Sequence, residues 1–199
     1  MSTPSERGAI GAVILAAGAS RRMGTNKMLL SVDGEPMVRR TARAAVDAGL
    51  DPVIVVLGHE PERVRAALEG LACTFVSSDD FTGPTSGSLH AGLRALENMQ
   101  ADAAVVLLGD MVRVSASMIA ALARSARTSD APLEVSRYGD VLAPPLLFKR
   151  SLWPELLAWT GEGCGKAVVR AHQAEATMHD WPAESLRDVE LRAILGVAA

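Results

Sequence analysis

The residues best suited to chemistry lie in one segment near the start of the chain, LAAGASRRMGTNKMLL, residues 15–30. It opens with Leu15, Ala16, Ala17 and Gly18. The alanines and the glycine carry almost no side chain, so backbone N–H groups can approach an anion closely. The cationic donors that follow are Arg21, Arg22 and Lys27. Small residues followed by cations suit a triphosphate, so the segment predicts a nucleotide-binding loop.

This segment does not fit the two common phosphate-binding motifs. A Walker A loop needs the spacing GxxxxGK[ST], whereas five residues separate Gly18 from Gly24, and Lys27 stands three residues further on. A dinucleotide-binding loop needs GxGxxG, which residues 15–30 lack. The alternative to a phosphate-binding loop is a solvated basic loop between a strand and a helix.

A second candidate side chain follows another predicted strand. Residues 103–108 are uniformly apolar and are followed by Gly109-Asp110-Met111. Ligands of open α/β sheets collect beyond the carboxyl ends of the strands, so Asp110 is expected beside the first loop. Mg²⁺ prefers one or two carboxylates together with substrate phosphates, which makes Asp110 a candidate metal ligand. The alternative for Asp110 is a turn residue or a helix N-cap.

The loop before a predicted helix at residues 88–98 offers polar contacts to a nucleotide. Its glycine and hydroxyl residues include Gly83, Ser86 and Ser88. Free N–H groups at a helix N-terminus attract anions, and the hydroxyls can reach a base or a ribose. Asp79 lies upstream and is either a contact to the base or ribose or an ordinary turn residue.

Apolar, strand-like runs alternate with helical patterns along the whole chain. Strands are predicted at residues 9–15, 53–57, 73–76, 103–108, 133–137, 146–148 and 174–179, and helices at residues 36–48, 61–68, 88–98, 115–127, 165–172 and 189–195. This alternation is typical of βαβ units. We therefore predict an α/β protein with a three-layer, Rossmann-like fold and a mainly parallel sheet containing one antiparallel strand.

The composition fits one folded domain with an aliphatic core. The 199-residue chain is 49% hydrophobic but only 4% aromatic, which favours an α/β protein over a disordered chain. Residues 9–199 are expected to form a single domain, and residues 1–8 a disordered leader.

Charge, hydropathy and cysteine content exclude several classes of function. The net charge of −3 argues against a general nucleic-acid binder. No apolar run of 18 residues is present, and the N-terminus lacks the apolar region of a signal peptide, so neither a membrane span nor secretion is expected. Cys73 and Cys164 form no CxxC pair, which indicates reduced thiols. The predicted location is the cytoplasm.

The first segment resembles the signature L-A-A-G-x-S-x-R-M-G-x-x-K-x-L-L of the MobA-like nucleotidyltransferases, and more narrowly their molybdenum cofactor cytidylyltransferase (MocA-like) branch. The eleven fixed positions are matched by Leu15, Ala16, Ala17, Gly18, Ser20, Arg22, Met23, Gly24, Lys27, Leu29 and Leu30. The resemblance implies a Mg²⁺-dependent nucleotidyltransferase fold and activity. CMP from CTP would be joined to the terminal phosphate of molybdopterin or the molybdenum cofactor, with release of pyrophosphate. It implies catalytic roles for Arg22, Lys27 and Asp110.

The chain departs from the family pattern in its second half. Val112 follows Gly109-Asp110-Met111 where the family usually has proline. Residues 161–166, GEGCGK, resemble a GDxG-type turn on the pterin side of the cleft, with Glu162 in the acidic position. Lys166 is a candidate contact to the acceptor phosphate. Asp188 is the one full match to the closing D-[IV]-D-T-P-E-D motif and is a candidate second metal ligand or an N-cap.

The residues leave alternatives for the base, the acceptor and the class of function. The cytidylyl branch is favoured because the loop reads LAAG and has no Asp two residues before Leu29. The enzymatic alternatives are guanylyl transfer and nucleotidyl transfer to a sugar phosphate or another phosphorylated small molecule. A non-catalytic chaperone that delivers the cofactor to a molybdenum hydroxylase apoenzyme is the alternative of another class. Arg22, Lys27 and Asp110 favour the enzyme, because a carrier does not need a metal carboxylate.

Overall fold

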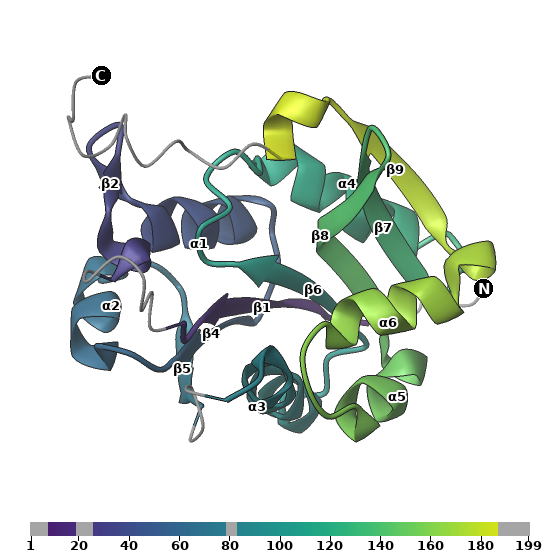
Figure 1. Ribbon diagram of the computed structural model, residues 1–199, viewed down its shortest axis with the longest axis horizontal. Coiled ribbons are helices and arrows are strands. Elements are labelled where there is room, and N and C mark those ends of the chain that lie inside the picture. The colour runs from purple at the N-terminus through teal and green to yellow at the C-terminus, as the bar shows by residue number, and fades with distance from the viewer. Residues whose placement is uncertain (1–7, 19–25, 79–82, 187–199) are drawn as a thin grey trace, which may run out of the picture.

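The computed structural model describes residues 8–18, 26–78 and 83–186, which are organised around one seven-stranded sheet (Figure 1). Its strands are β1 (Ile10–Ala16), β4 (Val53–Leu57), β5 (Thr74–Ser77), β6 (Ala103–Leu108), β7 (Leu133–Tyr138), β8 (Val141–Lys149) and β9 (Thr177–Trp181). Their order is β5-β4-β1-β6-β8-β7-β9, and β8 alone among them runs antiparallel to its neighbours. The predicted mainly parallel sheet with one antiparallel strand is confirmed.

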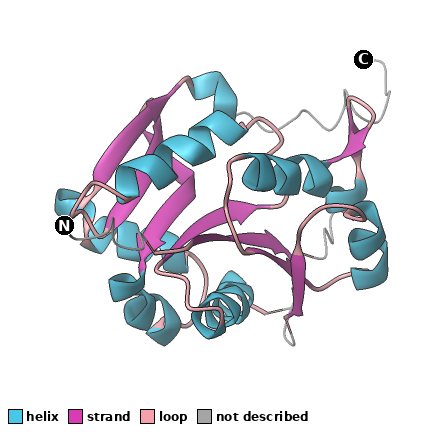
Figure 2. Cartoon of the chain, turned by 180° about the vertical axis from the view of Figure 1, so that it is seen from behind, coloured by secondary structure: helices cyan, strands magenta, loops and turns pink. Residues whose placement is uncertain are grey.

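Helices cover both faces of this sheet and complete three layers (Figure 1 and Figure 2). The helices are α1 (Met37–Asp47), α2 (Pro61–Ala67), α3 (Thr85–Asn98), α4 (Ala116–Ala126), α5 (Trp153–Ala158) and α6 (Cys164–Ala171). Side chains of α1, α2 and α4 pack on one face, and those of α3, α5 and α6 pack on the other. The three-layer Rossmann-like prediction is therefore also confirmed.

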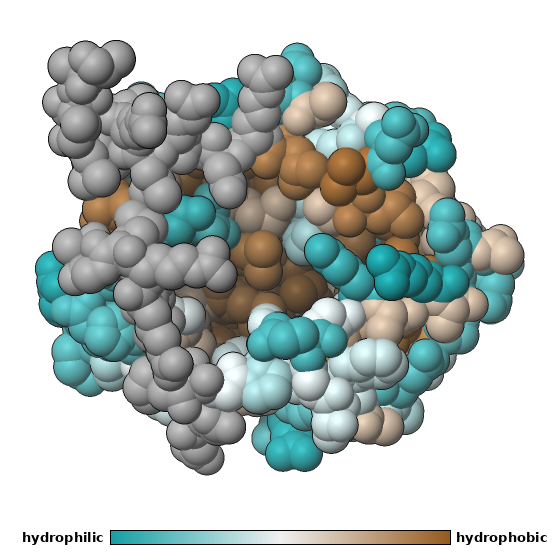
Figure 3. Space-filling model, in the orientation of Figure 1, coloured by the Kyte–Doolittle hydropathy of each residue, from teal (hydrophilic) through white to brown (hydrophobic). Residues whose placement is uncertain are grey.

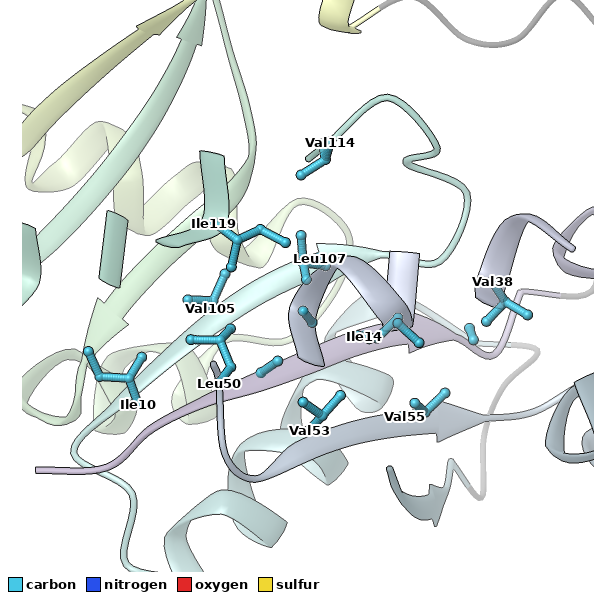
Figure 4. Close-up of a cluster of buried hydrophobic side chains, with 14 of the residues drawn as sticks. Ile10, Ile14, Val38, Leu50, Val53, Val55, Val105, Leu107, Val114 and Ile119 are labelled. Atoms are coloured by element: carbon cyan, nitrogen blue, oxygen red, sulfur yellow. The ribbon is translucent and has the colours of Figure 1, made fainter. Parts of the chain in front are cut away.

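The central strands are apolar on both sides, as parallel strands between two helical layers must be. In β1, Ile14 packs toward α1 and α4, whereas Val13 and Leu15 pack toward α3. Figure 4 shows the first of these clusters, in which Val38 and Ile119 extend from the helices onto the strands. Because each strand alternates in this way, it delivers a fixed set of side chains to each face.

Short elements fill the connections. They are the 3-10 helices η1 (Lys27–Leu29), η2 (Arg150–Leu152), η3 (Gln173–Glu175) and η4 (Ala183–Leu186), and the two-stranded hairpin of β2 (Ser31–Val32) and β3 (Glu35–Pro36). A turn at Asp33-Gly34 closes this hairpin, with φ of 51° and 82° at the two residues. Positive φ at both positions favours Asp-Gly.

Several boundaries differ from the prediction. Helix α3 begins at Thr85 rather than residue 88, β8 extends over Val141–Lys149 rather than residues 146–148, and α5 was not predicted. Two prolines inside β8 hid its strand pattern, since proline removes a ladder hydrogen bond. The expected helix at residues 189–195 and nearly all of the expected leader lie outside the described residues. Within the described ranges, no helix is long and apolar enough to cross a membrane.

Close packing of α3 on the sheet depends on Gly92. A Cβ here would overlap a Val13 methyl group and lie 3.2 Å from a Val56 methyl carbon. We expect Gly92→Ala to lower the free energy of unfolding by about 1–3 kcal/mol, because overpacking displaces neighbouring side chains. Urea denaturation measures the change. Gly165→Ala in α6 is the matched control, since its Cβ would meet no atom closer than 3.8 Å. Equal losses in both variants would contradict the packing argument.

Candidate functional site

The candidate site lies where the carboxyl ends of β1 and β6 meet. The next strand after β1, β4, lies beside it on one edge, and β6 lies beside it on the other edge. The strand order therefore reverses at β1, which makes this a topological switch point. Leu15 pairs with Leu108 at the ends of the two strands. A cavity of about 220 Å³ opens there, lined by Leu15, Ala17, Gly18, Met28, Gly83, Thr85, Ser88, Leu108 and Asp110. Figure 3 shows a hollow with a hydrophobic floor near the middle of the surface in view.

Two predicted catalytic residues, distant in sequence, meet in this site. The Lys27 Nζ lies 2.9 Å from the Asp110 Oδ2, with the two side chains 18% and 22% exposed. An ammonium and a carboxylate are thus held together at a partly solvent-accessible edge, where a phosphate and a cation can reach them. The structure therefore brings Lys27 and Asp110 together as the sequence predicted.

Asn26 positions Lys27 and was missed by the sequence analysis. Its side-chain oxygen accepts a hydrogen bond from the Met28 N–H at 3.1 Å and so caps η1. Its side-chain nitrogen donates to the His59 carbonyl oxygen at 3.1 Å, which ties η1 to the end of β4. Asn26 is buried, and the preference of asparagine for N-cap positions was the signal that could have identified it.

Gly109 allows the end of β6 to approach η1 closely and so places Asp110. A Cβ at Gly109 would lie 2.7 Å from the Met28 Sδ and 3.3 Å from the Leu15 carbonyl oxygen. The Gly109 N–H donates to that same carbonyl at 3.0 Å, and the Thr41 hydroxyl donates to the Gly109 carbonyl at 3.2 Å. The backbone before Asp110 is therefore held from two sides.

Most of the described nucleotide-binding candidates line the cavity, but Ala16, Lys27 and Ser86 do not. Lys27 instead contacts Asp110, which lines it. Leu15, Ala17, Gly18, Gly83 and Ser88 line it. The Ala16 side chain is fully buried in the core of the opposite face, because successive side chains of a strand alternate. Ser86 is buried, and its hydroxyl accepts a hydrogen bond from the Gly161 N–H at 3.2 Å. Arg22, Asp79 and Asp188 lie outside the described residues.

A second cavity, of about 420 Å³, adjoins the first and is more apolar. Both are lined by Leu15, Thr85 and Leu108, so they are neighbours. The other lining residues of the second are Leu89, Val106, Pro144, Leu146, Glu162, Gly163, Cys164, Gly165 and Lys166. Its floor comes from β6 and β8, and its wall from the first residues of α6 and the turn before it.

Cys164 in this wall is suited to packing rather than to nucleophilic chemistry. The thiol is buried and donates to the Leu156 carbonyl oxygen at 3.3 Å. Burial, with a smaller contribution from the nearby Glu155 carboxylate, raises the pKa of Cys164 to about 11. The thiolate is therefore scarce at neutral pH.

His172 connects the helices behind this wall. Its Nε2 lies 2.7 Å from the Glu155 Oε2 in α5, and its Nδ1 lies 3.1 Å from the Glu175 Oε1. The imidazole's hydrogen bonds to Glu155 and then Glu175 raise the pKa of His172 above its usual value.

The pH dependence of stability follows from that direction. Because the pKa of His172 is raised in the folded state, its contacts with Glu155 and Glu175 stabilise the fold fully below the unfolded-state pKa of about 6.5. This stabilisation disappears as pH rises through the folded-state pKa. We expect His172→Gln to lower Tm more at about pH 5.5 than at about pH 9. Thermal unfolding of both proteins across this range measures the difference. A Tm difference that does not change with pH would contradict the assignment.

The donor set fits a metal ion that is completed by substrate. Among the described residues, no group of three or more histidine, cysteine, aspartate or glutamate side chains forms a protein-only metal site. Asp110 instead offers one carboxylate that lines the smaller cavity. Mg²⁺ is bound in this way, by one or two carboxylates with phosphate and water oxygens.

The doubly wound sheet and the charged pair at its switch point are typical of α/β proteins that bind phosphorylated ligands at the ends of their strands. Residues 12–177 match the family model of the MobA-like NTP transferase domain, so the chain belongs to this family and is a nucleotidyltransferase. The family predicted from residues 15–30 is confirmed.

Two curated relatives are similar to this chain, and their names refer to different functions. The chain is 31% identical over 176 residues to the purine catabolism protein PucB of Bacillus subtilis, with 82% of each protein covered. It is 32% identical over 136 residues to the "Probable molybdenum cofactor guanylyltransferase" of Opitutus terrae, covering 68% of this chain and 64% of that protein.

A solved structure has the same architecture. Rv0371c from Mycobacterium tuberculosis has a TM-score of 0.78 and 26% identity to this chain, covering 88% of this chain and 89% of that one. A second crystal structure of Rv0371c, in complex with manganese, gives a TM-score of 0.70 at 25% identity, with the same coverage.

Proposed function

We propose that the chain transfers CMP from CTP to the terminal phosphate of molybdopterin, with or without its metal, and releases pyrophosphate. The observation that carries this proposal is the Lys27–Asp110 pair at 2.9 Å, because Asp110 lines the smaller of two neighbouring cavities. A nucleotide in the smaller cavity and an acceptor in the larger one would meet at Leu15, Thr85 and Leu108, which line both cavities. A cytoplasmic location and a molybdenum hydroxylase apoenzyme as recipient of the product are parts of the same proposal.

The residues would act by positioning and by neutralising charge. The attacking phosphate is already ionised at neutral pH, so no covalent intermediate is needed. Lys27, Arg22 and the backbone N–H groups near Gly18 would stabilise negative charge on the leaving pyrophosphate. Asp110, with Asp188 as a further candidate, would hold Mg²⁺, which when bound neutralises phosphate charge.

The apolar lining of the larger cavity supports an acceptor whose planar ring packs its faces on these side chains and keeps its polar atoms at the ring edge. The floor of this cavity is formed by Val106, Leu108 and Leu146, with Pro144 beside them. A sugar would leave its hydroxyl groups unpaired over these side chains, which costs binding free energy. Lys166 lines the same cavity and is the candidate contact to an anionic group of the acceptor.

Guanylyl transfer is the second candidate, and a specific observation favours it. The Opitutus terrae relative is named for guanylyl transfer to the molybdenum cofactor. The LAAG sequence of the first loop favours cytidylyl transfer instead. The two differ in the base alone, so a panel of nucleotides separates them.

The deciding experiment measures pyrophosphate release with CTP, GTP, ATP and UTP, with and without molybdopterin, in Mg²⁺ or EDTA. Release with CTP only when molybdopterin and Mg²⁺ are present would support the proposal. Release with GTP in its place would replace cytidylyl by guanylyl transfer. Nucleotide binding without release for every base would favour a cofactor chaperone or a different acceptor.

A further inference from the structure

Glu162 connects the two sides of the site through the start of α3. Its Oε2 accepts a hydrogen bond from the Thr85 hydroxyl at 2.7 Å, and its Oε1 lies 3.4 Å from the Thr85 backbone nitrogen. Thr85 is the first residue of α3, where backbone N–H groups lack partners within the helix. The carboxylate thus meets the positive end of a 14-residue helix, an electrostatically favourable position.

Two further hydrogen bonds hold the same turn in place. The Gly161 N–H donates to the Ser86 hydroxyl oxygen in the first turn of α3 at 3.2 Å. The Trp159 indole N–H donates to the Glu162 carbonyl oxygen at 3.3 Å, which closes the turn on itself. Residues 159–166 are therefore attached to α3 through both side-chain and backbone groups.

This connection lies between the two cavities. Thr85 lines both cavities. Of these two cavities, residues 162–166 line only the larger. The carboxylate also occupies the end of α3 that would otherwise attract an anion. An anion is therefore disfavoured at this end of α3.

We infer that Glu162 is a positioning residue that sets the distance between the bound nucleotide and the acceptor. The inference rests on the proposed transfer reaction but names a residue that does not itself react. Loss of the Glu162–Thr85 contact releases the acceptor wall from α3, and a displacement of about 1 Å between reacting groups can lower a rate 10²-fold. Nucleotide binding depends on the residues that line the smaller cavity, which do not include Glu162, and persists.

The test combines kinetics with binding in matched variants. We expect Glu162→Ala to lower kcat by about 10- to 100-fold while the Kd for CTP with Mg²⁺, measured by calorimetry, changes less than about twofold. Thr85→Val should also lower kcat with little change in the Kd for CTP. Thr85→Ser, which keeps the hydroxyl, should recover most of the lost kcat. The double variant Thr85→Val/Glu162→Ala should be no slower than the slower single variant. Glu62→Ala, which removes an exposed carboxylate of α2 on the other face of the sheet, is the control for charge.

Two results would overturn the inference: wild-type kcat in Glu162→Ala, or a loss of CTP affinity that matches the loss of kcat. If the wild-type protein transfers to no acceptor, the proposed function fails, and amide hydrogen exchange then decides the inference independently. Glu162→Ala should speed exchange at residues 84–88 and 161–166 together, because each segment holds the other. Faster exchange in one segment alone would disprove the connection.

Discussion

Asp110→Asn is expected to lower kcat/KM for nucleotidyl transfer by at least about 10²-fold, the scale of losing one stabiliser of transition-state charge. The variant keeps the size of the side chain but removes the charge that faces Lys27 at 2.9 Å. It also removes the carboxylate proposed to hold Mg²⁺, so the Mg²⁺ concentration for half-maximal activity should rise. Initial rates of pyrophosphate release across a Mg²⁺ titration measure both effects.

Asp102 provides a matched control for this variant. It is an exposed aspartate that precedes β6 at the opposite end of the strand from Asp110. Asp102→Asn changes the net charge equally but leaves the cleft untouched. We expect wild-type kinetics for Asp102→Asn. Wild-type turnover in Asp110→Asn would remove Asp110 from the site.

The sheet and the charged pair were predictable because the information that specifies them is local. Apolar runs of five or six residues at β4 and β6 have few alternatives to buried strands. The rule that ligands gather beyond strand ends then places Asp110 near the first loop without knowledge of any contact. Topology brings the ends of β1 and β6 together, and Asn26 and Gly109 then place Lys27 and Asp110 in contact across 83 residues.

The features that sequence reasoning missed depend on contacts between distant segments. Helix α3 starts early because Glu162, 77 residues away, meets its first N–H group. Asn26 looks like any loop asparagine until its contact with His59 is known. Helix α5 spans only six residues, too short for a periodic pattern, and is held by the burial of Trp153 and Leu156 against the sheet. Such tertiary contacts outweigh local propensity.

Lys27→Met should reduce kcat/KM by at least about 10²-fold while leaving the fold intact. Methionine retains the length and apolar stem of lysine but cannot neutralise the leaving pyrophosphate. Because the Lys27–Asp110 pair is partly exposed, its loss should change the free energy of unfolding by no more than about 1 kcal/mol. Thermal unfolding and initial rates on one protein preparation separate the two effects. A fall in stability large enough to explain the lost activity would assign Lys27 a structural role.

Two comparison variants sharpen the interpretation of Lys27. Lys27→Arg keeps the charge but replaces a compact ammonium by a planar guanidinium, so it should recover only part of the activity. Arg124→Ala removes an exposed cation from the last turn of α4 and should not affect the rate. The double variant Lys27→Met/Asp110→Asn should lose little more than the worse single variant, because groups that act on the same phosphates are not additive. Fully multiplicative losses would instead show that the two side chains act independently, against the paired geometry that places them together.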